Sequence, residues 1–194
     1  SYHPEYARHF PELKQWMNLV DYDHDGKADI FTYTTGGIKV FRNISQNEIA
    51  FMQVTFPYLK SKQGTTYTNI LVTTVDYPAL TDVDGDGDID VLSFWGLGAF
   101  VEWHKNLSEE KFGIPDSLIF EKVTGCWGHF AEGIENNKIT LDTCPNAQAE
   151  FLKGVKHTGS TLLVDDFNHD HLPDLALGDV DYSEIYLLPN GGEA

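Results

Sequence analysis

The stretch "DVDGDGDID" at residues 82–90 holds five aspartates in nine residues, one at every second position, with two glycines among them. Aspartate and glycine both disfavour strands and helices. Carboxylates packed this closely also repel one another. The chain therefore concentrates negative charge in a single turn, and something must compensate that charge.

The pattern around this stretch occurs three times, at residues 19–43, 80–106 and 163–190. Each copy reads as a short apolar lead-in, an acidic loop, an apolar strand, a turn, a returning strand and an asparagine. Alternation and β-forming residues predict strands in each copy. The expected hairpins pair residues 30–33 with 38–41, 91–95 with 100–103, and 175–177 with 185–188.

The spacing of the copies predicts the fold class. The acidic loops begin at Asp21, Asp82 and Asp166, so the intervals are 61 and 84 residues. A unit of about 60 residues fits a four-stranded sheet with its loops, the size of one propeller blade. No stretch has the 3.6-residue periodicity of an amphipathic helix, so we expect an all-β fold of β-propeller blades.

The domain organisation follows from the same intervals. We expect one β-propeller segment over 1–194, with repeats at about 15–60, 61–110 and 160–194 and a cysteine-containing insertion at about 111–159. Three blades cannot close a ring, because propellers need at least about four. The chain also begins without the pattern of a signal peptide. We therefore expect a fragment of a larger propeller.

The acidic loops have the spacing of a calcium site. We call residues 21–29 loop one, residues 82–90 loop two and residues 166–174 loop three. Oxygen ligands at positions one, three and five, a sharp turn at six and a main-chain carbonyl at seven wrap a chain around Ca²⁺. The ion removes the repulsion between the carboxylates. A plain solvated turn is the alternative for any single loop, but three copies in register favour the ion.

The calcium loop is not an EF-hand. An EF-hand needs a bidentate glutamate at position twelve and flanking helices. Position twelve here is Thr32, Ser93 or Leu177, and strands follow the loops. The aspartate at position nine is therefore expected to supply the closing carboxylate.

The "DxDxDGxxD" loop with its following strand resembles the FG-GAP/VCBS-type repeat of calcium-binding β-propellers. The resemblance implies that side chains at positions one, three, five and nine and the carbonyl at position seven hold the metal. These are Asp21, Asp23, Asp25, Asp29 and the carbonyl of Lys27 in loop one; Asp82, Asp84, Asp86, Asp90 and the carbonyl of Asp88 in loop two; and Asp166, Asn168, Asp170, Asp174 and the carbonyl of Leu172 in loop three.

Loop three departs from the pattern, because His171 replaces the glycine and Asn168 replaces a carboxylate. Two calcium sites are therefore expected, with loop three as an additional, weaker one. The last third of the chain, including "CWGHFAEGIENNKITLDTC" (126–144), resembles large surface proteins that Gram-negative bacteria export by the type IX secretion system. This resemblance implies a secreted or cell-surface location and contact with secretion-machinery components.

Composition limits the other partners. The chain has 30 acidic against 13 Lys and Arg residues, a formal net charge of −17. Such a surface repels nucleic acid and anionic membranes. No apolar run of about 18 residues could span a bilayer. We expect neither nucleic-acid binding nor membrane insertion.

Cys126 and Cys144 flank a segment with few other anchors. A disulfide between them would close that loop. Zinc bound by both cysteines with His129 and His157 is an alternative, and so are two free buried thiols. An oxidising compartment favours the disulfide.

Three other residue groups have ordinary explanations. The histidines of the acidic loops are expected to face solvent, because imidazole is a poor calcium ligand. The four tryptophans are expected to pack between sheets, with a sugar-stacking platform as the alternative. The sequons at Asn43 and Asn106 coincide with the asparagine of the repeat, so we expect a turn role. The tryptophans are Trp16, Trp95, Trp103 and Trp127, and the histidines are His24, His169 and His171.

No catalytic signature is present: the sequence lacks G-x-S-x-G, H-E-x-x-H and a phosphate-binding glycine loop. Glycoside hydrolysis stays an open alternative, because the abundant acids form suitable pairs by chance. We expect a calcium-stabilised, non-enzymatic β-propeller segment of a secreted or cell-surface bacterial protein, serving adhesion or the binding of a protein or glycan. The alternatives are an accessory carbohydrate-binding domain of a secreted hydrolase and export cargo captured with its secretion machinery.

Overall fold

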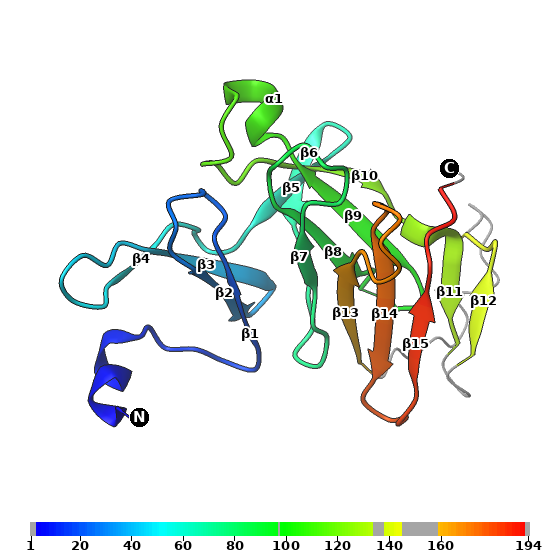
Figure 1. The fold of residues 1–194 in the computed structure, drawn as a ribbon, viewed down its shortest axis with the longest axis horizontal. Coiled ribbons are helices and arrows are strands. Elements are labelled where there is room, and N and C mark those ends of the chain that lie inside the picture. Colours follow the sequence, from blue (N-terminus) through cyan, green and yellow to red (C-terminus); the bar gives the residue numbers. More distant parts are fainter. Residues whose placement is uncertain (1–2, 97, 134–137, 145–158, 193–194) are drawn as a thin grey trace.

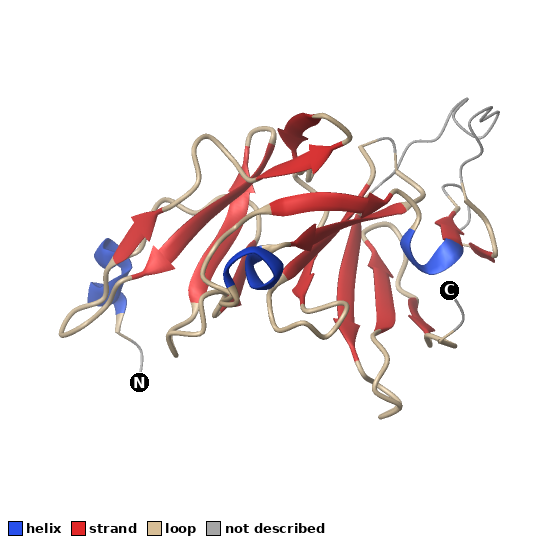
Figure 2. Cartoon of the chain, turned by 90° about the horizontal axis from the view of Figure 1, so that it is seen from above, coloured by secondary structure: helices blue, strands red, loops and turns tan. Residues whose placement is uncertain are grey.

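The computed structural model describes residues 3–96, 98–133, 138–144 and 159–192, and this part of the chain is mostly β (Figures 1 and 2). Its helical elements are short: the 3₁₀-helices η1 (Pro4–His9) and η2 (Trp127–His129), and the helix α1 (Ser108–Phe112). None of the helices in the described residues has the length and apolarity needed to cross a membrane.

Three antiparallel meanders correspond to the three sequence repeats. The first sheet has the order β1-β2-β3-β4, the second contains β7-β8-β9-β10, and the third is β13-β14-β15. The bounds are β1 Met17–Val20, β2 Asp29–Thr34, β3 Gly37–Asn43, β4 Phe51–Gln53, β7 Ala79–Thr81, β8 Asp90–Phe94, β9 Val101–Asn106, β10 Phe120–Thr124, β13 Ser160–Asp165, β14 Asp174–Asp179 and β15 Ile185–Leu188. The strands expected from the sequence are therefore present, and their observed ends differ from the predicted bounds by at most three residues, the largest difference being at the end of β9.

The second sheet gains strands from outside its meander. The hairpin of β5 (Lys60–Gln63) and β6 (Thr66–Asn69) joins its edge, where β5 runs parallel to β10. The strand β10 lies in the segment that we assigned to the insertion, yet it pairs with β9 and completes a four-stranded meander. Further along the same segment, the described residues include η2 and the small sheet of β11 (Phe130–Glu132) and β12 (Ile139–Leu141).

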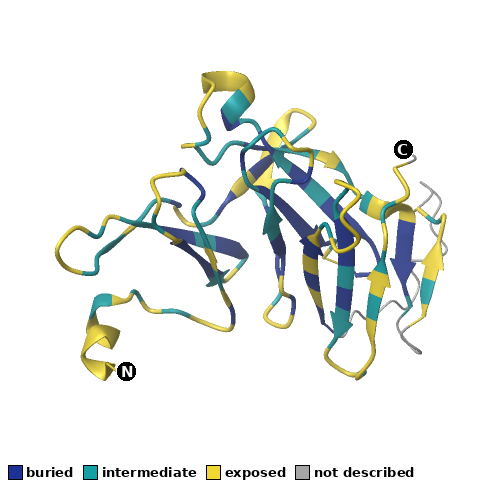
Figure 3. Ribbon diagram, in the orientation of Figure 1, coloured by how far each residue is buried: buried dark blue, intermediate teal, exposed yellow. Residues whose placement is uncertain are grey.

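Two hydrophobic cores join the three sheets face to face. The strand β8 is buried along its whole length, and its side chains alternate between the cores. Val91 packs with Phe31 and Ile38 of the first sheet. Leu92 packs instead with Leu162 of the third sheet. The two-residue period of a strand explains this division, and the second sheet lies between the other two (Figure 3).

The lead strands of the three meanders face a common groove. Residues of β1, β7 and β13 line a cavity of about 340 Å³, among them Leu19, Leu80 and Leu163. The first strands of the sheets therefore lie around one axis, as in the blades of a propeller. The sheets formed by the described residues do not close into a ring.

Cys126 and Cys144 form a disulfide, with a Cα–Cα distance of 5.7 Å. The disulfide confirms the expected pairing and leaves neither thiol free for zinc; His157 lies outside the described residues. The bridge joins the start of η2 to the segment that follows β12. It therefore holds the β11–β12 hairpin against the body of the protein.

Removing this disulfide is expected to lower the free energy of unfolding by about 3 kcal/mol. The reason is that the bridge closes a loop with a sequence separation of 18 residues, which restricts the unfolded chain. Urea unfolding of the Cys126→Ala/Cys144→Ala variant and of the oxidised protein, both in calcium, measures the difference. A difference below about 1 kcal/mol would contradict a structural role.

Candidate metal centres

Each acidic loop connects the first strand of a meander to the second. Loop one joins β1 to β2, loop two joins β7 to β8, and loop three joins β13 to β14. The aspartate at position nine is in each case the first residue of the second strand. The hairpin thus fixes one end of every loop.

The three loops share one pattern of hydrogen bonds. The carboxylate at position one accepts from the main-chain amides at positions five and six, and the carboxylate at position five accepts from the amide at seven. For position one the N–O distances to the amides at five and six are 3.1 and 2.9 Å at Asp21, 3.2 and 3.0 Å at Asp82, and 3.0 and 3.0 Å at Asp166. For position five they are 3.0 Å at Asp25, 3.1 Å at Asp86 and 2.9 Å at Asp170.

Positions four and six of every loop have left-handed backbone conformations. At position six Gly26, Gly87 and His171 have φ values of 85°, 101° and 71°. Histidine enters this region more readily than most residues with a side chain, so loop three keeps the turn without glycine. Position four has the same conformation at His24, Gly85 and His169. The loop histidines are exposed, as the sequence predicted.

Carboxylates converge in loops one and two. Oxygen atoms of Asp21, Asp23 and Asp29 lie within 4.8 Å of one another, and so do oxygen atoms of Asp82, Asp84 and Asp86. Oxygens on opposite sides of a calcium ion are about 5 Å apart, since each lies about 2.3–2.6 Å from it. The spacing and the all-oxygen donor set therefore fit a hard divalent cation.

Some predicted ligands lie outside these clusters. Asp25 is absent from the loop-one cluster, and its Oδ2 lies 2.9 Å from the Nζ of Lys27. Asp90 is absent from the loop-two cluster. Loop three brings no three carboxylates together within the described residues, and its Asn168 donates to Asp170 Oδ2 at 2.9 Å. The proposed carbonyl ligands of Lys27, Asp88 and Leu172 stay predictions.

A basic side chain lies against the acids in loops one and two. Arg42 Nε is 2.5 Å from Asp23 Oδ2, and Lys105 Nζ contacts Asp84 Oδ2 and lies 2.9 Å from Asp86 Oδ2. Arg42 and Lys105 each precede the asparagine of their repeat, and in loop three this place is taken by Pro189. A basic residue therefore precedes the repeat's asparagine where position three of the loop is an aspartate, but not in the third repeat, where position three is Asn168.

Replacing Lys105 by methionine is expected to strengthen calcium binding at loop two by about 3- to 10-fold. An ammonium group close to the carboxylates opposes a divalent cation, although solvent weakens this effect. Calcium titration followed by calorimetry measures the change. Lys62→Met is the matched control, because Lys62 pairs with Glu121 instead. Equal affinities in the two variants would contradict the competition.

The aspartate at position nine is a buried structural anchor in all three repeats. Asp29, Asp90 and Asp174 have no exposed surface. One oxygen of each accepts from the amide at position two, at 3.2 Å, and the other accepts from the amide of the repeat's asparagine, at 2.7 Å. The carboxylate therefore ties the start of the loop to the end of the returning strand.

The asparagines at the end of each repeat take part in this anchor, whereas we expected Asn43 and Asn106 to be turn residues only. Their main-chain amides reach Asp29 and Asp90, and the side chains donate to Ala28 and Ser117 carbonyls. The recurrence of asparagine at the same place in each copy was the available signal. Trp103 Nε1 also donates a hydrogen bond to Asp90 Oδ2, at 3.0 Å, and no pattern in the sequence predicted this bond.

Burial raises the pKa values of three acids in the loops. The pKa is about 6 for Asp29 and Asp88 and about 7 for Asp90, because burial penalises the charge more than the nearby donors stabilise it. For Asp86 burial also acts upward, but the Lys105 ammonium and the Asp88 amide outweigh it and hold the pKa below its usual range.

The calcium-free protein is expected to become more stable as the pH falls from 7 to about 5. Asp29, Asp88 and Asp90 have folded pKa values above their ordinary value of 3.8, so the folded state takes up protons that the unfolded state does not. This contribution is complete below pH 3.8 and is lost as the pH rises through 6 to 7.

Calcium-loaded protein should show the opposite trend over the same range, because protons compete with the ion for carboxylates. Urea unfolding at pH 5, 6 and 7, with chelator and with calcium, compares the two. Parallel trends in the two series would contradict calcium binding by the carboxylates of the loops.

Comparison with protein families identifies the repeat. An FG-GAP-like repeat matches residues 21–93, from the start of loop one into β8. No curated protein and no solved structure matches the chain. The protein is thus a mostly β molecule of several antiparallel sheets that contains an FG-GAP-like repeat.

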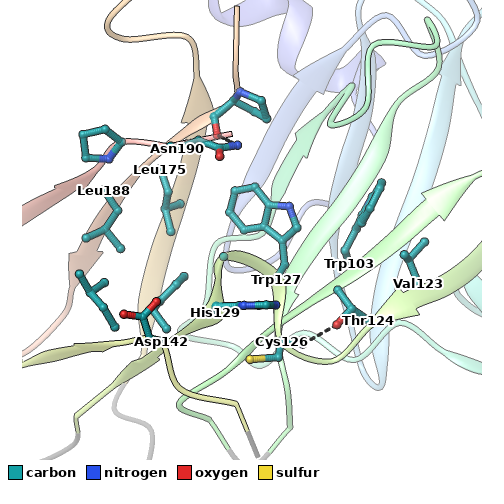
Figure 4. A pocket seen from close by; sticks show the side chains of 16 residues that line it. Trp103, Val123, Thr124, Cys126, Trp127, His129, Asp142, Leu175, Leu188 and Asn190 are labelled. Carbon is teal, nitrogen blue, oxygen red and sulfur yellow. Dashed lines mark hydrogen bonds between the residues drawn. The ribbon is translucent and has the colours of Figure 1, made fainter. Parts of the chain in front are cut away.

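A cleft separates the third sheet from the disulfide-bridged segment. It has a volume of about 460 Å³. Trp127 projects from η2 into it, with Trp103 of β9 on one side and Leu175 and Leu188 on the other (Figure 4). His129, Asp142 and Asn190 place polar groups on the wall. The cleft therefore combines aromatic rings with hydrogen-bonding groups.

Proposed function

We propose that the protein is a calcium-stabilised, non-enzymatic β-propeller segment of a secreted or cell-surface bacterial protein. The observation that carries the proposal is the loop geometry, which is repeated three times and brings carboxylates together in two of the copies. Calcium holds each loop by joining side chains that otherwise repel one another.

The extracellular location is supported by two features. Disulfides persist in oxidising compartments, and Cys126 and Cys144 are bridged. A calcium loop without the glutamate at position twelve suits the millimolar calcium found outside cells. Export by a type IX secretion system, and contact with its components, is proposed from the resemblance of the last third of the chain.

The third sheet has an exposed apolar face against which a further blade would pack. Leu163 and Leu187 flank Ala176 across adjacent strands, so they share one face. Leu163 is 56% exposed, Leu187 53% and Ile185 76%. A neighbouring sheet would bury these side chains, as the second sheet buries the opposite face. This surface supports the proposal that the three sheets belong to a larger propeller.

The cleft around Trp127 supports adhesion through a glycan. Sugar rings stack on tryptophan faces through their C–H groups, and their hydroxyls bond to carboxylate and amide groups. Trp103 and Trp127 supply rings, and Asp142 and Asn190 supply polar groups. The same cleft suits the second candidate function, an accessory carbohydrate-binding domain of a secreted hydrolase.

A glycan array tests the ligand-binding part of this proposal. Labelled protein in 1 mM calcium is expected to retain at least one glycan class, and Trp127→Ala is expected to lose it by at least 10-fold. Tyr67→Ala is the control, because Tyr67 is exposed on β6, away from the cleft. No retention of any glycan, or equal retention by Trp127→Ala, would contradict glycan binding in the cleft.

A further inference from the structure

Loop two differs from the other loops at position seven. Position seven is Lys27 in loop one and Leu172 in loop three, but it is Asp88 in loop two. In loop one the Lys27 ammonium lies 2.9 Å from Asp25 Oδ2 and so neutralises the acid at position five. In loop two the acid at position five, Asp86, has a second carboxylate beside it.

Asp88 is a buried carboxylate with only one oxygen satisfied. Its side chain has no exposed surface. Oδ2 accepts from the amides of Ser108 and Glu109, at 2.9 and 3.1 Å. Oδ1 is buried and has no hydrogen-bond partner. A buried carboxylate oxygen without a partner is costly, and a cation is the simplest group that could bind it.

The helix α1 brings a third acid to the same place. Its Glu110 has a carboxylate oxygen within 4.8 Å of oxygens of Asp86 and Asp88. The two amide bonds from the start of α1 to Asp88 hold this helix beside loop two. No helix follows the returning strand in the first or third repeat within the described residues. The cluster therefore belongs to the second repeat alone.

Lys105 only partly balances this charge. Its Nζ lies 2.9 Å from Asp86 Oδ2 and 2.5 Å from Glu110 Oε1, and it also contacts Asp84. It has no contact with Asp88 Oδ1, which stays unpartnered. Among the described residues, the two overlapping acidic clusters hold five acids, against the single ammonium of Lys105: Asp82, Asp84, Asp86, Asp88 and Glu110. One ion in the loop and one lysine leave an excess of negative charge.

We propose that Asp86, Asp88 and Glu110 form a second calcium site in the second repeat, beside the loop site and sharing Asp86 with it. Three carboxylates with oxygens within 4.8 Å of one another fit a single hard divalent cation. The inference rests on the proposed calcium function, because Asp86 serves both ions. When the ion binds, Lys105 leaves the carboxylates for solvent. The ion then fastens α1 to loop two.

Calcium titration calorimetry of three proteins tests the second site, with calcium chloride as the only probe. Wild-type protein is expected to bind one calcium ion more than Glu110→Gln. The matched control is Glu109→Gln, which makes the same charge change on the same helix and is expected to bind as many ions as wild type. Glu110 has a side chain 42% exposed, so its substitution is expected to leave the fold intact.

The number of ions decides the outcome. Loss of Glu110 also frees Lys105 to compete at the loop, so a lower affinity with an unchanged number of ions would overturn the second site. An unchanged number and affinity would overturn it too. Neither result contradicts the proposed calcium sites of loops one and two. A wild-type protein that binds no calcium would instead overturn the proposed function as well.

Discussion

Removing calcium is expected to lower the melting temperature of the protein by about 10–20 °C. If each loop binds with a Kd of about 10 μM, about 1 mM calcium adds about 2.7 kcal/mol for each ion. Two such sites add about 5 kcal/mol to the free energy of unfolding. For a domain of this size each kcal/mol corresponds to about 2–4 °C.

Differential scanning calorimetry in 1 mM calcium and in excess chelator measures this shift. Returning excess calcium to the chelated sample serves as the control, because it separates ion loss from damage by the chelator. Magnesium at the same concentration is expected to restore less, since it demands stricter octahedral geometry. A melting temperature that is the same with and without chelator would contradict structural calcium.

Asp90→Asn is expected to destabilise the calcium-free protein by about 3 kcal/mol. The two oxygens of Asp90 accept from Val83, Asn106 and Trp103. An asparagine amide has only one oxygen, so its NH₂ group must face at least one of these buried donors whichever way it turns. A buried donor without an acceptor costs about 1–3 kcal/mol.

Asp84→Asn is the matched control for this substitution. Asp84 lies on the exposed side of loop two and contacts Lys105 there. Its loss is expected to weaken calcium binding by at least 10-fold but to change the stability in chelator by less than about 1 kcal/mol. Urea unfolding of both variants in chelator measures the difference. Equal effects of the two substitutions would contradict the anchoring role of position nine.

Much of the fold was predictable because its signals are local. Each acidic loop and the hairpin after it lie in consecutive residues, and β2, β8 and β14 formed where β-forming residues followed by turn residues predicted strands. The strand β10 was misplaced, because its partner β9 lies across the helix α1 and pairing between strands is not a local property. The apolar residues Leu118, Ile119 and Phe120 indicate a strand, but they do not indicate which sheet that strand joins.

The candidate site was likewise predictable only where its signals are local in the sequence. Positions one, three and five were predicted from their spacing. The shared amide bonds involve positions one and five, and metal binding by all three positions stays a prediction. Position nine was expected only as a ligand, but it also anchors the returning strand through contacts about 14–16 residues away. The side chain of Asp88 was overlooked because its partners, Glu110 and the start of α1, lie about 20 residues further along the chain.

The central claim is that loops one and two close around calcium, and a crystal structure of the protein grown in calcium tests it most directly. The account predicts one anomalous density peak among Asp21, Asp23 and Asp29 and another among Asp82, Asp84 and Asp86, each about 2.3–2.6 Å from the carboxylate oxygens. Arg42 and Lys105 would then point away from the acids. Loops without a peak, with both basic side chains still against the carboxylates, would contradict the claim.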